Sequence, residues 1–318
     1  MTEPAVFRRR AVAVSALALA VWLPGCGGDT TGPGAGVDGS ADEDAGDRHN
    51  HSSDGGSFAE APTFHADAFP ELALWLDADD DDTLTLTAGG RVAVWNDKSN
   101  RENHAYQGTE RLMPAFAPNA RAGRAAVQFD GSYLTTSDLI QLRATLAGYT
   151  VFAVAKNTVA DGVEGTAGRG GILLGSFGRT EPNVGIELHH DRRLRHWWDR
   201  RDGHDQPADG NRGDAIVAEP RPARGAYAML LFTLDAEAGL AGGGVDGVLG
   251  DEQPDDGPTY EVRTPLRVGA DYREGPLSVA WEGAIAEILV FERLLSADEL
   301  AELQAYLSRK WNIPVDGA

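Results

Sequence analysis

The chain has 318 residues and a formal net charge of -21, because Asp and Glu outnumber Lys and Arg by 49 to 28. Such acidity argues against nucleic acids and anionic lipid headgroups as partners, since both are themselves negatively charged. It is compatible with divalent cations and with neutral glycans. The single cysteine, Cys26, excludes a disulfide within the chain.

The first predicted element is an export signal. Three arginines, Arg8 to Arg10, precede a run from Ala11 to Leu23 that is apolar except for Ser15. A membrane-spanning helix needs about 20 apolar residues, and this run is shorter. A basic start followed by a short apolar core is typical of cleaved signal peptides.

The segment Leu23-Pro24-Gly25-Cys26 resembles a bacterial lipoprotein signal, in which the cysteine becomes the acylated N-terminus. The resemblance implies a signal peptide over residues 1–25 and lipid attachment at Cys26. Pro24 departs from the pattern, which has a small residue two positions before the cysteine. Gly27 stands where an aspartate would resemble an inner-membrane retention signal. We therefore expect an exported, lipid-anchored protein at the outer membrane or cell surface.

Residues 26–62 are rich in Gly, Asp and Ser and contain almost no apolar side chains. Such a segment cannot bury enough apolar surface to offset the entropy of ordering it. We expect a disordered tether between the lipid and the domain that follows. His49 and His51 lie in this tether, where solvated side chains are the simplest expectation.

The remaining residues, 63–316, are expected to form one domain of short strands separated by Gly- and Asp-rich turns. Apolar alternation and β-branched runs predict strands over 70–77, 91–95, 125–129, 149–155, 171–176, 184–188, 194–198, 226–234, 244–249, 266–269 and 284–291. Many short strands with little helix indicate an all-β fold, a jelly-roll sandwich of two antiparallel sheets. The turn at 191–193 is expected to pair the strand at 194–198 back onto the one before it.

A C-terminal helix is the last predicted element. Ser296 followed by Glu299 matches a capping box. Leucines and a tryptophan then recur at helical spacing, and Ile313-Pro314 ends the pattern. The apolar stripe, which should dock on the sandwich, consists of Leu300, Leu303, Leu307 and Trp311.

Several segments together resemble the laminin-G-like branch of the concanavalin A-like lectin and glucanase superfamily. They are ALWLDADDDDTLTL, VAVWNDKSNRENHAYQ, AVQFDGSYL, VDGVLG and IAEILVFERLLSADELAELQAYLSRKW. The resemblance covers about Phe69 to Pro314 and implies two antiparallel sheets, one of them concave. Members of the superfamily bind glycans, bind proteins or act as glycan hydrolases or lyases, so the fold alone does not assign a function.

The sequence does not show the paired carboxylates of a glycosidase, which face one cleft about 5 to 9 Å apart. Glu282 and Glu287 are five positions apart, so strand alternation should send them to opposite faces. Glu187 stands alone on its strand, with His189 two positions later. A Glu–His couple could abstract a proton as in a lyase, and catalysis stays an alternative.

Two clusters of oxygen ligands could hold calcium. The first is the acidic run that begins at Asp77, and the second combines Asp97 and Asn103 around a turn. Turn capping by Asx hydrogen bonds is the alternative for both. An EF-hand is excluded for the first cluster, because Asp82 and Ala88 stand where a glycine and a glutamate are needed.

A carbohydrate site is indicated by adjacent tryptophans on the strand at 194–198. Trp197 and Trp198 must point to opposite faces, so one should be buried and the other should face outward. Trp197 shares its face with Arg195, which favours Trp197 as the outward one. His189 and Arg200 would frame the exposed ring. Zinc binding by the histidines at 189, 190, 196 and 204 is an alternative for this region.

The sequence thus predicts a membrane-anchored surface lipoprotein whose jelly-roll domain binds a carbohydrate or a cell-surface protein without catalysis. A surface glycan hydrolase or lyase, or a purely adhesive protein, would fit the same fold. No nucleic acid is expected as a partner.

Replacing Cys26 by Ser should release the protein from the membrane fraction, because the tether and the acidic domain offer no other anchor. Fractionation and mass spectrometry of the mature N-terminus measure this. An unlipidated N-terminus in the native chain would contradict the lipoprotein assignment.

Overall fold

The computed structural model describes residues 64–65, 68–140, 142, 148–159, 171–176, 183–199, 212–257, 264–270 and 280–315. The chain divides into two units, 1–56 and 57–318, and the second is described here by itself. The predicted signal peptide, Cys26, the tether and Arg200 lie outside the described residues. None of the described helices is long and apolar enough to cross a membrane.

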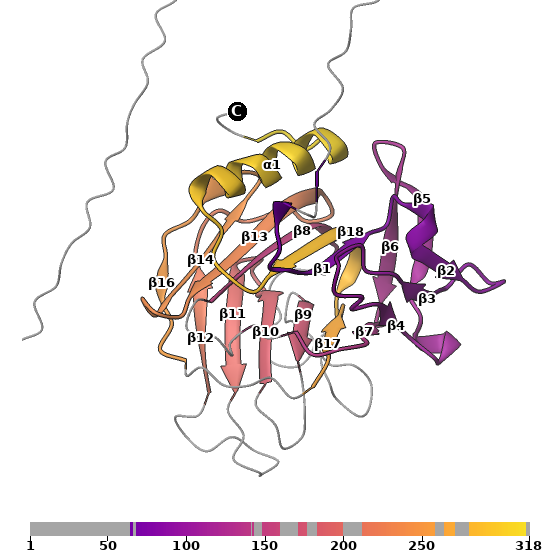
Figure 1. The fold of residues 1–318 in the computed structure, drawn as a ribbon, viewed down its shortest axis with the longest axis horizontal. Helices are drawn as coiled ribbons and strands as arrows, with labels where there is room; N and C mark the ends of the chain where they lie inside the picture. Colours follow the sequence, from indigo (N-terminus) through magenta and orange to yellow (C-terminus); the bar gives the residue numbers. More distant parts are fainter. Residues whose placement is uncertain are drawn as a thin grey trace, which may run out of the picture. The chain divides into compact units, whose positions relative to one another are not determined.

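The domain is a sandwich of two antiparallel sheets, which confirms the predicted all-β class (Figure 1). Sheet A contains nine strands: β1 (Leu72–Asp77), β5 (Ala115–Arg121), β6 (Arg124–Asp130), β8 (Tyr149–Asn157), β13 (Tyr227–Asp235), β14 (Leu240–Val245), β15 (Val248–Leu249), β16 (Gln253–Pro254) and β18 (Glu282–Phe291). Sheet B also contains nine: β2 (Leu84–Leu86), β3 (Val92–Trp95), β4 (Ala105–Tyr106), β7 (Leu134–Thr136), β9 (Ile172–Ser176), β10 (Asn183–Leu188), β11 (Leu194–Asp199), β12 (Arg212–Val217) and β17 (Leu266–Val268). Two 3-10 helices, η2 (Asp81–Thr83) and η3 (Glu110–Leu112), and one α-helix, α1 (Ala297–Trp311), complete the described elements.

Sheet A is covered on both faces. One face packs against sheet B through a core that includes Val151, Phe232 and Ile288. The other packs against α1 and the segment around Phe64 through a second core, which includes Leu289. The strands β8, β13 and β18 are therefore apolar on both faces, which explains why they read as continuous apolar runs in the sequence.

Helix α1 has the predicted capping box. The Ser296 hydroxyl accepts from the Glu299 backbone N–H, and the Glu299 carboxylate accepts from the Ser296 backbone N–H. Leu303, Leu307 and Trp311 are fully buried against sheet A, as the stripe predicted.

The register of β18 corrects one expectation. A β-bulge between Ile285 and Glu287 interrupts the alternation of the strand. Glu287 therefore lies on the α1 side of sheet A, together with Ala284 and Leu289. The argument that spacing sends Glu282 and Glu287 to opposite faces was wrong, because alternation holds only where no extra residue is inserted.

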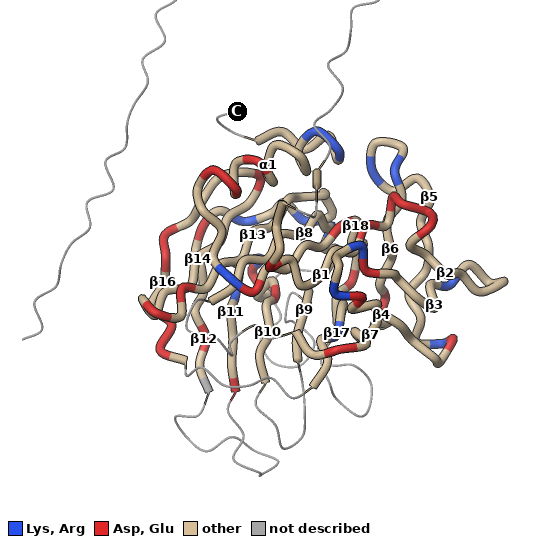
Figure 2. Tube along the Cα trace, viewed as in Figure 1, with Lys and Arg blue, Asp and Glu red and all other residues tan. Residues whose placement is uncertain are grey.

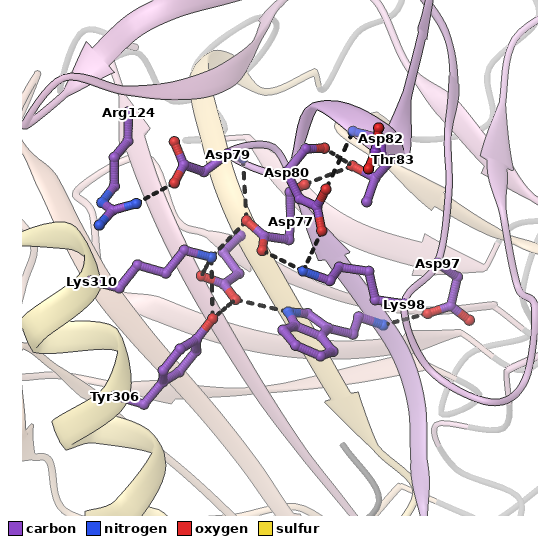
Figure 3. Close-up of polar contacts among 12 residues, drawn as sticks. Asp77, Asp79, Asp80, Asp82, Thr83, Asp97, Lys98, Arg124, Tyr306 and Lys310 are labelled. Carbon is purple, nitrogen blue, oxygen red and sulfur yellow. Dashed lines mark hydrogen bonds and ion pairs between the residues drawn. The ribbon is translucent and has the colours of Figure 1, made fainter. Parts of the chain in front are cut away.

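A buried charge cluster joins α1 to β1 and β18, and Figure 3 shows Asp77, Tyr306 and Lys310 of this cluster. The Glu287 carboxylate is fully buried and accepts hydrogen bonds from the Trp75 indole at 2.8 Å, the Tyr306 hydroxyl at 2.8 Å and the Trp311 indole at 2.6 Å. The Lys310 ammonium lies 3.0 Å from Glu287 Oε2. Burial raises the pKa of the Glu287 carboxyl, against the opposing charge of Lys310.

Asp77 extends the same cluster onto β1. Its Oδ1 lies 2.7 Å from the Lys310 ammonium, and its Oδ2 lies 3.0 Å from the Lys98 ammonium. Lys98 also binds Asp80 at 2.7 Å. Asp77 and Glu287 face each other across the β1–β18 pair, so the Lys310 ammonium binds two neighbouring carboxyl groups at once.

Acidic residues gather at one edge of sheet A (Figure 2). Between Val245 and Gly257 the chain carries Asp246, Asp251, Glu252, Asp255 and Asp256 and no Lys or Arg. This stretch includes the short edge strands β15 and β16. Charge beside an edge strand hinders its pairing with another sheet.

Replacing Leu307 by Ala should lower the free energy of unfolding by about 2 to 5 kcal/mol, because it empties a site that is fully buried between α1 and sheet A. Urea unfolding of the full chain measures the change. Leu300→Ala, at a partly buried position of the same helix, is the control and should cost less. Equal costs for the two variants would contradict the docking of α1.

Candidate functional site

The candidate site lies on the outer face of sheet B, which is the face that points away from sheet A. The inner face of sheet B packs on sheet A. On β11, Leu194, His196 and Trp198 are buried on the inner side, whereas Arg195 and Trp197 are half-buried on the outer side. The strand thus divides its tryptophans between the two faces, with Trp197 outward.

The strand register arranges outer-face residues in one row across the sheet. Directly paired residues share a face, so the pairing alone defines the row. From β12 to β4 it runs Asp214, Trp197, Gly185, Gly175, Arg267, Thr135 and Tyr106.

Two glycines stand in the middle of this row. A Cβ on Gly185 would lie 2.5 Å from the Trp197 Nε1, so the indole rests directly on the backbone of β10. Gly175 follows on β9 and also lacks a side chain. No side chain of the row therefore stands between Trp197 and Arg267 over two strands, a width of about 10 Å.

Further aromatic and cationic side chains lie at and beside the end of the row that is opposite to Trp197. The Arg267 guanidinium lies 4.5 Å from the ring centroid of Tyr133, which is a cation–π contact. Tyr106 is 50 % exposed. The outer face thus presents aromatic rings on both sides of the glycines.

An ionic network borders Trp197. Arg195 Nη1 lies 2.7 Å from Glu187 Oε1, and Arg195 Nε lies 2.8 Å from Asp214 Oδ2. Glu187 is only 1 % exposed. The guanidinium lies between the two carboxylates and links β10, β11 and β12 through their side chains.

The sequence missed several of these residues. Asp214 lies on β12, and Tyr106 lies on the two-residue strand β4; neither strand was predicted. The sequence RGDAIV contains Gly and Asp, which are depleted in strands, and two residues are too few for a periodic signal. Arg267 was placed on a predicted strand, but the pairing that aligns it with Trp197 is long-range.

Trp198 and His189 lie elsewhere. Trp198 is 6 % exposed on the inner face, and a Cβ on Gly213 would lie 2.7 Å from its Cζ2. His189 lies in the β10–β11 turn, four residues beyond the level of Trp197 and so about 13 Å along the strands. The structure does not bring His189 to Trp197.

His189 belongs to a small cluster of its own. Among the described residues, His189, His190 and Asp191 are the one group of His and acidic side chains close enough to share a metal ion, with ligand atoms within 4.8 Å. Asp191, however, already binds His189 Nδ1 at 3.0 Å and Arg193 Nε at 2.7 Å. Burial lowers the pKa of His189. Partial burial acts to raise the pKa of Asp191, but the bond from His189 and the charge of Arg193 lower it to about 2.

The candidate calcium ligands Asp77 and Asp97 are bound to protein donors (Figure 3). Asp77 binds two lysine ammoniums, as described above. Asp97 accepts the Trp75 and Ser99 backbone N–H groups at Oδ1, and the Ser99 hydroxyl and Asn103 N–H at Oδ2, all within 2.6 to 2.9 Å. The Asn103 amide donates to the Ala73 carbonyl at 2.7 Å. The bonds from Ser99 N–H to Asp97 and from Asp79 N–H to Asp77 are Asx contacts of the turn-capping alternative, whereas the lysine ion pairs of Asp77 are not.

We expect the melting temperature of the domain to be the same with calcium and with a chelator, because protein donors already fill these carboxylates. Calorimetry of the full chain measures it. A bound ion would stabilise the fold by roughly 2.7 kcal/mol at a hundredfold excess over its dissociation constant. Such a shift, abolished in Asp97→Asn, would establish calcium binding.

No family model and no curated protein matches the chain. Similar solved structures include the binding domain of Paraclostridial Mosquitocidal Protein 1, at 11 % identity and a TM-score of 0.50, over 74 % of this chain and 52 % of that one. The Botulinum neurotoxin serotype D binding domain is similar at 11 % identity and a TM-score of 0.50, over 77 % and 55 %. The chain therefore spans about half the length of these two toxin domains. Domain 4 of AbnA, a GH43 extracellular arabinanase from Geobacillus stearothermophilus solved with arabinotriose, matches at 14 % identity and a TM-score of 0.49, over 74 % and 98 %.

At these identities the two toxin domains show the β-sandwich fold and nothing finer. The laminin-G-like resemblance stays a prediction.

Proposed function

We propose that this protein is a lipid-anchored binding module whose sandwich domain holds neutral carbohydrate on the outer face of sheet B. The observation that carries the proposal is the row in which Trp197 and Tyr106 stand on either side of Gly185 and Gly175. The Trp197 indole is half-buried against the Gly185 backbone and Tyr106 is half-exposed, and the apolar face of a sugar can stack on rings of this kind.

Polar groups beside the ring fit the same ligand. Small-molecule sites combine apolar surface with a few oriented polar groups. Arg195 is held in place by two carboxylates, and Asp214 is exposed next to Trp197. A charge of -21 disfavours polyanionic glycans, so a neutral polysaccharide or oligosaccharide is the expected class.

The proposal does not include catalysis. A glycosidase needs two carboxylates on either side of the scissile bond. Among the described residues, Glu187 and Asp214 border Trp197, and both bind the same guanidinium. The Arg195 guanidinium therefore occupies the space between the two carboxylates, where the scissile bond of a substrate would have to lie.

Anchoring at Cys26 and surface localisation belong to the same proposal and rest on the N-terminal sequence. A protein partner on the same face is the second candidate, because exposed aromatic side chains also favour protein interfaces.

Replacing Trp197 by Ala should abolish binding to neutral glycans, measured on a glycan array and by calorimetry with the best hit, with a small change in melting temperature. Trp198→Ala is the matched control, since it removes the same side chain from the next position on the buried face. It should cost about 3 to 5 kcal/mol of stability.

Unchanged glycan affinity in Trp197→Ala, or no neutral glycan bound by the native chain, would overturn the carbohydrate proposal. Turnover of a bound polysaccharide would overturn the claim that the module is not an enzyme.

A further inference from the structure

The buried charge cluster described above places three reactive groups together: the Lys310 amine, the Asp77 carboxyl and the Glu287 carboxyl (Figure 3). We propose that Lys310 and Asp77 are joined by an intramolecular isopeptide bond, formed in the folded domain with Glu287 as the proton relay. This goes beyond the proposed function, because it concerns a covalent modification on the side of sheet A that packs against α1.

The nucleophile and the electrophile are already in contact. The Lys310 Nζ lies 2.7 Å from Asp77 Oδ1. Near-attack conformers hold the reacting atoms about 3 to 3.5 Å apart, and an amine at hydrogen-bond distance from a carboxylate oxygen is near that separation from Cγ. Both side chains are largely buried, with 12 % and 5 % of their surfaces exposed. Bulk water is thus kept from most of the reacting atoms.

Glu287 is positioned to move protons between them. Glu287 Oε2 lies 3.0 Å from the Lys310 Nζ, and Glu287 is the direct cross-strand partner of Asp77. The bonds from Trp75, Tyr306 and Trp311 hold the carboxyl in a fixed orientation. Burial also raises the pKa of Glu287, against the charge of Lys310, which favours its holding a proton more than an exposed carboxyl would.

The step is a condensation that needs no other reactant. The ammonium of Lys310 gives up two protons, its nitrogen forms a bond to Cγ of Asp77, and Oδ1 leaves with those protons as water. Glu287 accepts a proton from Nζ and returns it to the leaving oxygen, so its own state is unchanged at the end. Neither oxidant nor reductant is consumed.

Lys98 is the other amine on Asp77, but its surroundings differ. It lies 3.0 Å from Oδ2 and is closer to Asp80, at 2.7 Å. Its side chain is 25 % exposed, twice the fraction for Lys310. Lys310 is therefore the amine that shares a dry site with Glu287.

The bond would tie the first strand of the domain to its C-terminal helix. The folded domain contains no cysteine, so a disulfide cannot do this. A crosslink between residues so far apart in sequence would restrict the unfolded chain in the way a long-range disulfide does.

Intact mass spectrometry of the purified full chain tests the proposal. We expect a deficit of about 18 Da, one water, and after trypsin digestion under denaturing conditions a branched peptide that joins the segments around Asp77 and Lys310. Lys310→Arg should restore the missing water, so that the variant is heavier than the native chain by about 46 Da rather than the about 28 Da of the substitution alone.

Lys98→Arg is the matched control, since it makes the same substitution at the other lysine bound to Asp77, and it should keep the deficit. Glu287→Gln should lose the deficit or acquire it far more slowly. The proposal would be overturned if the native protein had its full unmodified mass and gave two separate linear peptides. Lys310 and Asp77 would then form an ion pair without a covalent bond, whatever the variants show. A branch at Lys98 instead of Lys310 would also overturn it.

Discussion

The burial of the Glu287 carboxylate constrains much of the architecture. An ionisable group can be withdrawn from water only where donors and an opposite charge compensate it, and removing one partner of a buried ion pair typically costs about 3 to 5 kcal/mol. Here the donors come from β1 and α1, and the opposite charge comes from Lys310 on the same helix. Segments from the two ends of the domain must therefore pack on β18 together. Partial assembly would leave a charge without compensation.

That constraint also determines which surfaces are buried. Because α1 and the Phe64 segment pack on one face of sheet A, and sheet B packs on the other, the central strands of sheet A are buried on both faces. The outer face of sheet B points away from both of these cores. The ring and ionic groups of the candidate site are on that face, where the register aligns Trp197 with Arg267 across two glycines.

Much of the fold could be predicted from the sequence because its strongest signals are local. The β-branched run at Tyr149–Asn157 and the capping box at Ser296 are each visible within about ten residues. The short strands β4 and β12 could not be predicted in this way, because their order comes from pairing with distant strands. The bulge beside Glu287 was missed for the same reason, since nothing local distinguishes an inserted residue from a regular one.

The candidate site was predicted only in part. The alternation of Arg195, Trp197 and Trp198 identified one outward-facing ring, since it needs only the period of a strand. Nearness in sequence predicts that His189 frames that ring, and this is wrong because the hairpin places His189 at the turn. Asp214 and Tyr106 share a face with Trp197 only through the register of the whole sheet.

The packing of Phe64 has a consequence for the two ends of the domain. Phe64 stacks on Tyr306 of α1 with ring centroids 5.2 Å apart, within the apolar core between α1 and sheet A. The start of the described domain and its C-terminal helix therefore share one apolar layer. Removing either segment would expose the ring of the other to water, so the two ends of the fold should loosen together.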